Sequence, residues 1–367
     1  MRHSLIFSLA LLLVTDIFLL DCKFVIAEGQ PQSVYGKRIE RTMRLLKGEK
    51  VAPGDEEWQK ICKRYEKEPI PAADKPTAAV AASLGKCSSY QLYFGFNQAA
   101  NPEQARWCAF DEIDKKREDG PFSGNDMLMM IYANGVGAKR NLPLAIKLAC
   151  TIEGAPAEME ERVTHLEKLR KKNWQGTDFS LCDDITSGVM QGYCADHFEN
   201  FAKIKRNKKI KDIQASWSKA ELADYALLRQ AADHYIQAHV ENEVDESGTA
   251  RGALAIEAQA YLEDEFLAVL EALSRGKLRS YSAEQFKAAD SKLNNIYKNI
   301  QKTKETDVVW GSVSKKGIQD TQRKWIRYRD AWVEFCHKRF PNAQSNSIKT
   351  ILTYLRVEVL KQFVVCE

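Results

Sequence analysis

The chain has 367 residues, of which 44% are hydrophobic and 28% are charged, and these proportions are ordinary for a globular protein with a substantial core. Its 54 basic and 50 acidic residues leave a net charge of only +4. This balance is too even to indicate a nucleic acid as the partner.

Residues 1–27 are predicted to be an export signal. Arg2 supplies a positive start, residues 4–14 are almost entirely apolar, and the stretch ends in the triplet Val25–Ala27. Small or β-branched residues at the end of such a stretch suit a signal peptidase, so we expect cleavage after Ala27. Asp16 interrupts the apolar stretch, which is too short for a comfortable membrane span. The sequence therefore predicts a periplasmic or secreted protein without a stable membrane anchor; a retained anchor is the alternative.

Cysteines support the same compartment. Cleavage would remove Cys22 and leave an even number, which is typical of disulfides made in an oxidising compartment. Because most of them lie between residues 62 and 194 and the others beyond residue 335, we expect at least two cross-linked blocks, with the pairing left open. The disulfide candidates are Cys62, Cys87, Cys108, Cys150, Cys182, Cys194, Cys336 and Cys366.

The region from residue 28 to 200 is predicted to contain short helices, because prolines recur between residues 69 and 156. One segment in it, residues 124–150, is similar to a Sel-type helical repeat. Only one copy is visible, and a solenoid needs about three units, so we expect a local helical hairpin at about residues 123–150. The matching small and aromatic positions are Leu128, Tyr132, Gly135, Gly137, Ala145 and Ala149.

Longer helices are predicted after a basic stretch at residues 203–211. No proline occurs between Pro156 and Pro341, and apolar residues recur at steps of three and four in five successive segments. Sustained period-two alternation is missing, so the fold class is all-α, with a helical bundle over residues 201–367. The predicted buried faces include Leu222, Tyr235, Leu254, Tyr261, Trp325, Tyr328, Trp332 and Phe335.

The bundle also carries a recognisable pattern of the form D-x-x-L-N-x-x-Y, then Q-R-x-W-x-x-x-R-D, a cysteine and an arginine in the last helix. It resembles the LprI-type lysozyme-inhibitor-like family of bacterial envelope proteins, over about residues 283–363. A second cysteine that this family usually has before its last helix is replaced by residues 348–350, and Cys366 is the nearest substitute. The matching positions are Asp290, Leu293, Asn294, Tyr297, Gln322, Trp325, Arg329, Asp330, Cys336 and Arg356.

The resemblance implies a non-catalytic binding protein whose partner is a lysozyme or another peptidoglycan-cleaving enzyme. The polar motif residues also have a physical interpretation. Asp290, Asn294 and Tyr297 share a helix face with an apolar stripe, and unpaired buried polar groups cost about 1–3 kcal/mol each. We expect the next helix, through Arg329 and Asp330 among others, to complete a buried network that fixes helix register. A contact surface for the target is the alternative.

An acidic segment between two predicted helices is a further candidate partner surface. Lysozymes are usually cationic, and acidic groups could speed their association. A solvated turn is the alternative. The residues are Glu241, Glu243, Asp245 and Glu246.

Catalytic and cofactor motifs are missing from the sequence: there is no G-x-S-x-G, no H-E-x-x-H and no phosphate loop. We therefore predict that the protein is not an enzyme and has no cofactor. Cys182, Cys194 and His197 could be drawn as zinc ligands, but disulfides are the preferred prediction for a secreted chain. An alternative function is a periplasmic scaffold that binds other envelope proteins through its N-terminal helical hairpins.

Overall fold

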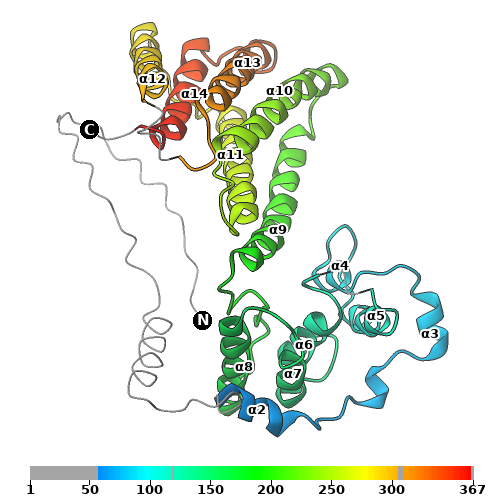
Figure 1. The fold of residues 1–367 in the computed structure, drawn as a ribbon. Coiled ribbons are helices and arrows are strands. Elements are labelled where there is room, and N and C mark those ends of the chain that lie inside the picture. Colours follow the sequence, from blue (N-terminus) through cyan, green and yellow to red (C-terminus); the bar gives the residue numbers. More distant parts are fainter. Residues whose placement is uncertain (1–56, 118–119, 305–309, 365–367) are drawn as a thin grey trace. The chain divides into compact units, whose positions relative to one another are not determined.

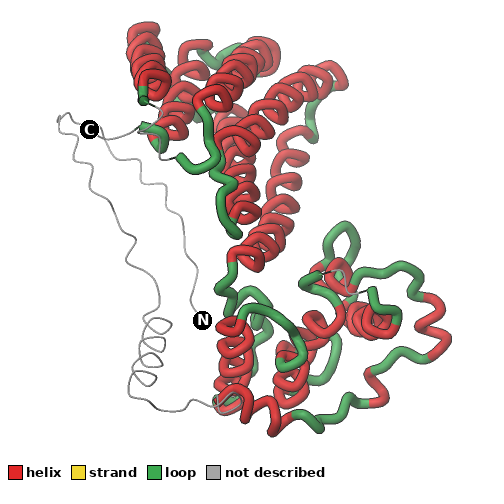
Figure 2. The backbone as a smooth tube through the Cα atoms, in the orientation of Figure 1, coloured by secondary structure: helices red, strands yellow, loops and turns green. Residues whose placement is uncertain are grey.

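The computed structural model describes residues 57–117, 120–304 and 310–364. Within these ranges all regular secondary structure is helical and no strand is present (Figure 2). The prediction of an all-α fold is confirmed. The predicted signal peptide and Cys366 lie outside the described residues.

Short helices make up the first part of the described chain (Figure 1). Three of them, α5, α7 and α8, have a proline in the first helical positions, where the missing N–H costs nothing. The prediction that prolines begin short helices in this region is confirmed. These elements are α2 (Glu57–Tyr65), η1 (Ala72–Asp74), α3 (Ala78–Ser83), α4 (Ser89–Phe94), α5 (Pro102–Asp114), α6 (Gly124–Asn134), α7 (Leu142–Ala149) and α8 (Pro156–Lys171).

Two helical hairpins in this region, α4–α5 and α6–α7, have the same turn. The first helix of each ends at a glycine in the left-handed conformation, Gly95 with φ 75° and Gly135 with φ 66°. The second helix of each begins at an asparagine cap, Asn101 or Asn141, whose side chain accepts a hydrogen bond from the third backbone amide that follows. Both the glycine pair and the asparagine pair are therefore offset by 40 residues.

The same backbone hydrogen bond closes both turns. The amide of Asn101 donates to the Leu92 carbonyl at 2.8 Å, and the amide of Asn141 donates to the Tyr132 carbonyl at 2.9 Å. The predicted hairpin at about residues 123–150 is thus present as α6 and α7, and α4–α5 is a second copy that the sequence analysis missed. The assignment of these hairpins to the Sel type stays a prediction.

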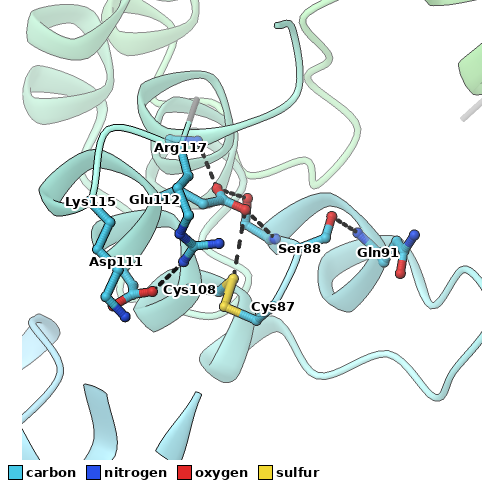
Figure 3. Close-up of a disulfide and its surroundings, with 10 residues drawn as sticks. Cys87, Ser88, Gln91, Cys108, Asp111, Glu112, Lys115 and Arg117 are labelled. Carbon is cyan, nitrogen blue, oxygen red and sulfur yellow. Dashed lines mark hydrogen bonds and ion pairs between the residues drawn. A yellow bond between two sulfur atoms is a disulfide. The ribbon is translucent and has the colours of Figure 1, made fainter. Parts of the chain in front are cut away.

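Three disulfides cross-link this region, as predicted for its cysteines. They join Cys62 to Cys150, Cys87 to Cys108, and Cys182 to Cys194. Cys87–Cys108 ties the loop before α4 to the middle of α5 (Figure 3). The disulfide-linked N-terminal region is confirmed.

A buried carboxylate, Glu112 of α5, lies beside that disulfide (Figure 3). It accepts hydrogen bonds from the backbone amide and the hydroxyl of Ser89, at 2.9 Å and 2.5 Å, and from the amide of Gly124 at 2.9 Å. Ser89 and Gly124 are the first residues of α4 and α6, where backbone amides are otherwise unpaired. One carboxylate thus fastens the starts of both hairpins to α5.

Long helices form the second part of the chain. The predicted region boundary at residue 200 falls inside α9, and the division there stays a prediction. Separate apolar cores lie on either side, one built mainly from residues 61–194 and the other from residues 217–363. The long helices are α9 (Gly188–Gln214), α10 (Lys219–Glu243), α11 (Arg251–Ser274), α12 (Ala283–Lys302), α13 (Lys315–Arg339) and α14 (Ser345–Lys361).

The aromatic stripe of α13 forms the centre of the bundle core. Trp325, Tyr328, Trp332 and Phe335 are each at most 3% exposed, so the prediction that they are core residues is confirmed. They pack with apolar residues of α10, α11 and α14. The predicted faces of α10 and α11 are wrong in part, because Leu222, Leu254 and Tyr261 are 40%, 42% and 53% exposed and their helices bury a neighbouring stripe instead.

Glycines allow α9 and α11 to approach closely. A Cβ placed on Gly188 of α9 would lie 2.4 Å from the Thr249 hydroxyl and 2.5 Å from the amide nitrogen of Ala250. One turn later, the same construction on Gly192 meets its nearest atom at 3.5 Å, which is an ordinary contact. The crossing is therefore tightest where α9 begins.

Candidate functional site

A buried ion pair joins two distant helices of the bundle. Arg356 of α14 contacts Glu243, the last residue of α10, through two bonds of 2.7 Å and 2.6 Å. Both side chains are 0% exposed. This two-pronged geometry is the strongest form of an arginine–carboxylate contact.

Neighbouring polar groups complete the surroundings of this pair. Arg356 Nε donates to Gln322 Oε1 at 2.9 Å, and His239 Nδ1 lies 2.8 Å from Glu243 Oε2. Burial alone would raise the pKa of Glu243, but the Arg356 guanidinium and the His239 contact outweigh it and hold that pKa below its usual value. The Glu243 carboxylate therefore stays ionised. Arg356 Cζ also lies over the Tyr235 ring, 5.6 Å from its centre.

These contacts connect α10, α13 and α14 through two residues of the family-like motif, Gln322 and Arg356. A buried network that links three helices is therefore present, but it is not the predicted one. Of the residues expected to form it, only Gln322 takes part, and its centre is the pair of Glu243 and Arg356.

Arg329 and Asp330 lie outside this network, and the prediction that they are buried there is wrong. They form an ion pair with each other, Nη2 to Oδ1 at 2.8 Å, and the Asp330 side chain is 56% exposed. Asp330 is two residues away from both Tyr328 and Trp332, which face the core, so it points outward. The Arg329 guanidinium covers the Trp325 ring at 5.4 Å.

The polar motif residues of α12 are also at the surface. Asn294 Nδ2 donates to Asp290 Oδ2 at 2.9 Å, one turn away on the same helix. No contact joins either of them to Gln322, Arg329 or Asp330 in the described structure, contrary to the expected network. Tyr297 is half-buried, and burial raises the pKa of its phenol.

The remaining motif residues, Leu293 and Cys336, are core side chains at 2% and 0% exposure. Cys336 is a free thiol, so its prediction as a disulfide partner is contradicted. The side chain points into the apolar core of the bundle, where no other described cysteine lies, and burial raises the pKa of the thiol to about 12. The expected second cross-linked block is not found in the described part of the chain.

The predicted acidic surface is wrong for one of its residues. Glu243 is buried in the ion pair, at the end of α10 and not in a loop. Asp245 accepts hydrogen bonds from the amides of Ser247 and Ser312, both at 2.9 Å, and these bonds lower the pKa of its carboxyl to about 2. Only Glu241 and Glu246 are fully exposed, so this segment mainly holds the loop before α13.

The zinc alternative is not supported, because Cys182 and Cys194 are bonded to each other. His197 is buried among aromatic rings and stacks on Phe122 at 4.7 Å. Burial lowers the pKa of this imidazole to about 4. No cluster of three or more metal-ligating side chains occurs in the ranges that the structure describes.

Sequence reasoning missed one unusual carboxyl group, Glu265 of α11. Its Oε2 atom is buried without a hydrogen-bond partner, and burial raises the pKa of this carboxyl to about 7. Tyr261 and Arg356 lie close enough to lower the pKa in part. No sequence signal marks it, because Glu265 belongs to the acidic run Glu263–Glu265, and such a run is typical of a solvated helix face.

Comparison with known proteins connects this bundle to a family. Residues 271–360 match the family model described as "Lysozyme inhibitor LprI". The match spans α12, α13 and α14 and contains all of the motif residues, so the resemblance is confirmed over this segment. No curated protein and no solved structure matches the chain. None of the described helices is long and apolar enough to cross a membrane.

Proposed function

From the family match of residues 271–360, we propose that this chain is an exported, non-catalytic binding protein that inhibits a lysozyme or another peptidoglycan-cleaving enzyme. The match is the observation that carries the proposal. The three disulfides support export, because such bonds persist in oxidising compartments. We further propose that the signal ends at Ala27 and that the protein acts in the periplasm or outside the cell.

The contact surface that we propose consists of polar motif residues outside the core, of which Asn294 and Asp330 are exposed and Asp290 and Arg329 are half-buried. Asp290 and Asn294 pair with each other on α12, and Arg329 pairs with Asp330 on α13. Pairs with an exposed partner contribute at most about 1 kcal/mol to stability, so the fold alone gives little reason for Asn294 and Asp330, whereas Arg329 also covers the Trp325 ring. The buried motif residues, by contrast, are accounted for by the core and by the Arg356 network. The exposed ones are therefore the part of the motif that is available to a target.

Turnover of bacterial cell walls by a lysozyme, with the full chain added over a wide concentration range, tests the proposal. We expect inhibition, and we expect Arg329→Ala and Asp330→Ala to weaken it about 5- to 30-fold, as loss of charged contacts at an interface does. Arg327→Ala is the matched control, because Arg327 is an exposed arginine of the same helix with no ion pair in the described structure. All three variants should melt like the parent.

Two outcomes would count against this proposal. Unchanged turnover by lysozymes of several types would remove the inhibitory function. Inhibition that survives both Arg329→Ala and Asp330→Ala would move the contact surface elsewhere. The scaffold alternative stays a prediction, and capture of envelope proteins by residues 57–187 without the bundle would favour it.

A further inference from the structure

A cavity of about 570 Å³ lies where α9, α11 and α13 end, away from the exposed motif residues. A smaller one of about 330 Å³ adjoins it and shares Ile213 and Ser274 with it. The larger cavity has apolar and aromatic walls beside small polar groups. The residues that matter for the argument are Trp217, Leu273, Phe340, Ser216, Ser274 and Asn342.

The polar groups of the larger cavity are available to a ligand. The side chains of Ser216 and Asn342 have no hydrogen-bond partner among the described residues, and both residues are exposed. The aromatic wall is held in place, because the Arg339 guanidinium lies between the rings of Trp217 and Phe340, at 5.4 Å and 5.1 Å. A rigid aromatic wall beside free hydroxyl and amide groups suits a sugar, which presents C–H faces and hydroxyls together.

Basic side chains surround the smaller cavity. It is lined by Lys209, Arg275, Asp212 and Glu271. Lys209 and Arg275 both reach Glu271, at 3.3 Å and 3.6 Å, and Asp212 pairs with Lys208 at 2.7 Å. The loop that follows α11 adds Lys277 and Arg279, which have no ion-pair partner in the described structure. With the flanking side chains included, the cations Lys208, Lys209, Arg275, Lys277 and Arg279 outnumber the two carboxylates, Asp212 and Glu271, and such an excess favours an anion.

We propose that these joined cavities bind an anionic saccharide, a sugar that carries a carboxylate or phosphate group. The sugar ring lies in the larger cavity against Phe340, where Ser216 and Asn342 bind its hydroxyl or amide groups. The anionic group points to Lys209 and Arg275. This site is separate from the surface proposed for the target enzyme and does not rest on that function.

Calorimetric titration of the full chain with two disaccharides tests the proposal. N-acetylglucosaminyl-N-acetylmuramic acid and diacetylchitobiose share the same ring frame, and the first carries an additional lactyl carboxylate. We expect the carboxylated sugar to bind about tenfold more tightly, because a charge-assisted contact is added. Arg275→Ala should remove this preference, and Asn342→Ala should weaken both sugars about fivefold, as loss of one hydrogen bond does.

Matched controls separate a built site from general attraction. Lys203→Ala removes an exposed cation of α9 that lines neither cavity, so it should leave both affinities unchanged. Ser274→Trp should place an indole ring in the space where the two cavities meet and abolish sugar binding. The melting temperature and the inhibition of lysozyme should stay as in the parent.

Four results would overturn the proposal. The first two are no heat of binding with either disaccharide and equal affinity for both. The others are an equal loss of sugar affinity in Arg275→Ala and Lys203→Ala, and inorganic phosphate that competes with the sugar and binds as tightly as the sugar does. The last would indicate a simple anion site. Failure of lysozyme inhibition would not bear on this site, because the variants that test the two proposals are different.

Discussion

Arg356 shows how much a single residue contributes when its partner is buried with it. Arg356→Ala leaves the Glu243 carboxylate inside the bundle without its main counter-charge. We expect this change to lower the free energy of unfolding by about 3–5 kcal/mol, measured by urea denaturation. Asp330→Ala is the control, and its effect should stay below about 1 kcal/mol because the Asp330 side chain is 56% exposed.

A double change tests the cause of that loss. Replacing both partners, as Arg356→Met with Glu243→Met, removes both buried charges and should recover much of the stability. If the double variant is as unstable as Arg356→Ala, packing volume and not charge is responsible. If Asp330→Ala proves as costly as Arg356→Ala, the surface position of Asp330 is wrong.

Glu265 makes the stability of the bundle depend on pH. The pKa of its carboxyl in the folded protein, about 7, lies above its ordinary value of 4.5, so the folded state binds this proton more tightly than the unfolded chain. The stability that this proton contributes is fully present below about pH 4.5 and is lost as the pH rises through about 7. Over this range the free energy of unfolding should fall by about 1–3 kcal/mol. Glu265→Gln should remove this dependence and stabilise the protein at pH 8.

The test is the difference in melting temperature between parent and Glu265→Gln at several pH values from 4 to 8. This difference isolates Glu265 from the histidines, whose contributions are common to both proteins. A difference that does not change with pH would show that the carboxyl titrates normally.

Residue-scale roles were only partly predictable from the sequence. Trp325 and Trp332 were placed correctly, because their spacing follows the helical period and needs no knowledge of other helices. The partner of Arg356 was missed, because Glu243 lies 113 residues away in the chain. Glu243 also stands among other acids, and sequence alone does not say which of them turns inward.

At the scale of the helix, the aromatic stripe of α13 is expected to carry much of the stability of the bundle. Trp332 is 0% exposed, and its ring centre lies 5.0 Å from that of Phe266. Trp332→Ala should cost about 3–5 kcal/mol in chemical denaturation, because it leaves a cavity in the core. Ile326→Ala, on the outer face of the same helix at 39% exposure, is the control and should change stability by less than about 1 kcal/mol. Similar losses in both would disprove the assignment of faces.

The crossing of α9 and α11 gives a second test at this scale. Gly188→Ala brings a methyl group against Thr249 and Ala250, so we expect a loss of about 1–3 kcal/mol in thermal or urea unfolding. Gly192→Ala is the control, because its Cβ has room and alanine favours a helix by about 0.5–1 kcal/mol over glycine. Equal stability of the two variants would mean that the helices do not approach so closely.

Helix positions were easier to predict than helix contacts. The five long helices α10 to α14 and the α6–α7 hairpin were anticipated from periodicity and from proline and glycine positions. The α4–α5 copy was missed because few residues coincide with those 40 positions later, namely Gly95, Asn101, Ala105 and Ala109. A turn is defined by backbone conformation, and many side chains are compatible with it.

At the scale of the molecule, the disulfides among the described residues all lie before residue 195, and the described bundle has none. Reduction of the disulfides should therefore destabilise the region before residue 195 and leave the stability of the bundle unchanged. We expect backbone amides of α4–α7 to exchange hydrogen markedly faster after reduction, while those of α13 keep their rates.

Hydrogen exchange followed by mass spectrometry, with and without reductant, measures this difference. Peptides from non-reduced protein should also show the pairs Cys62–Cys150, Cys87–Cys108 and Cys182–Cys194. Uniform acceleration across the chain would show that the bundle depends on the cross-linked region. A peptide that joins Cys336 to another cysteine would contradict its assignment as a free thiol.

The shared turn of the two hairpins also has an evolutionary reading. Two units with the same glycine, the same asparagine cap and the same closing bond, 40 residues apart, are the arrangement that a tandem duplication of one gene segment would produce. A unit that carries its own turn and its own cap can form the same hairpin wherever it is copied. Descendants of the same ancestor should therefore differ in length by entire hairpins, while insertions of one or two residues between a glycine such as Gly135 and its asparagine should be rare.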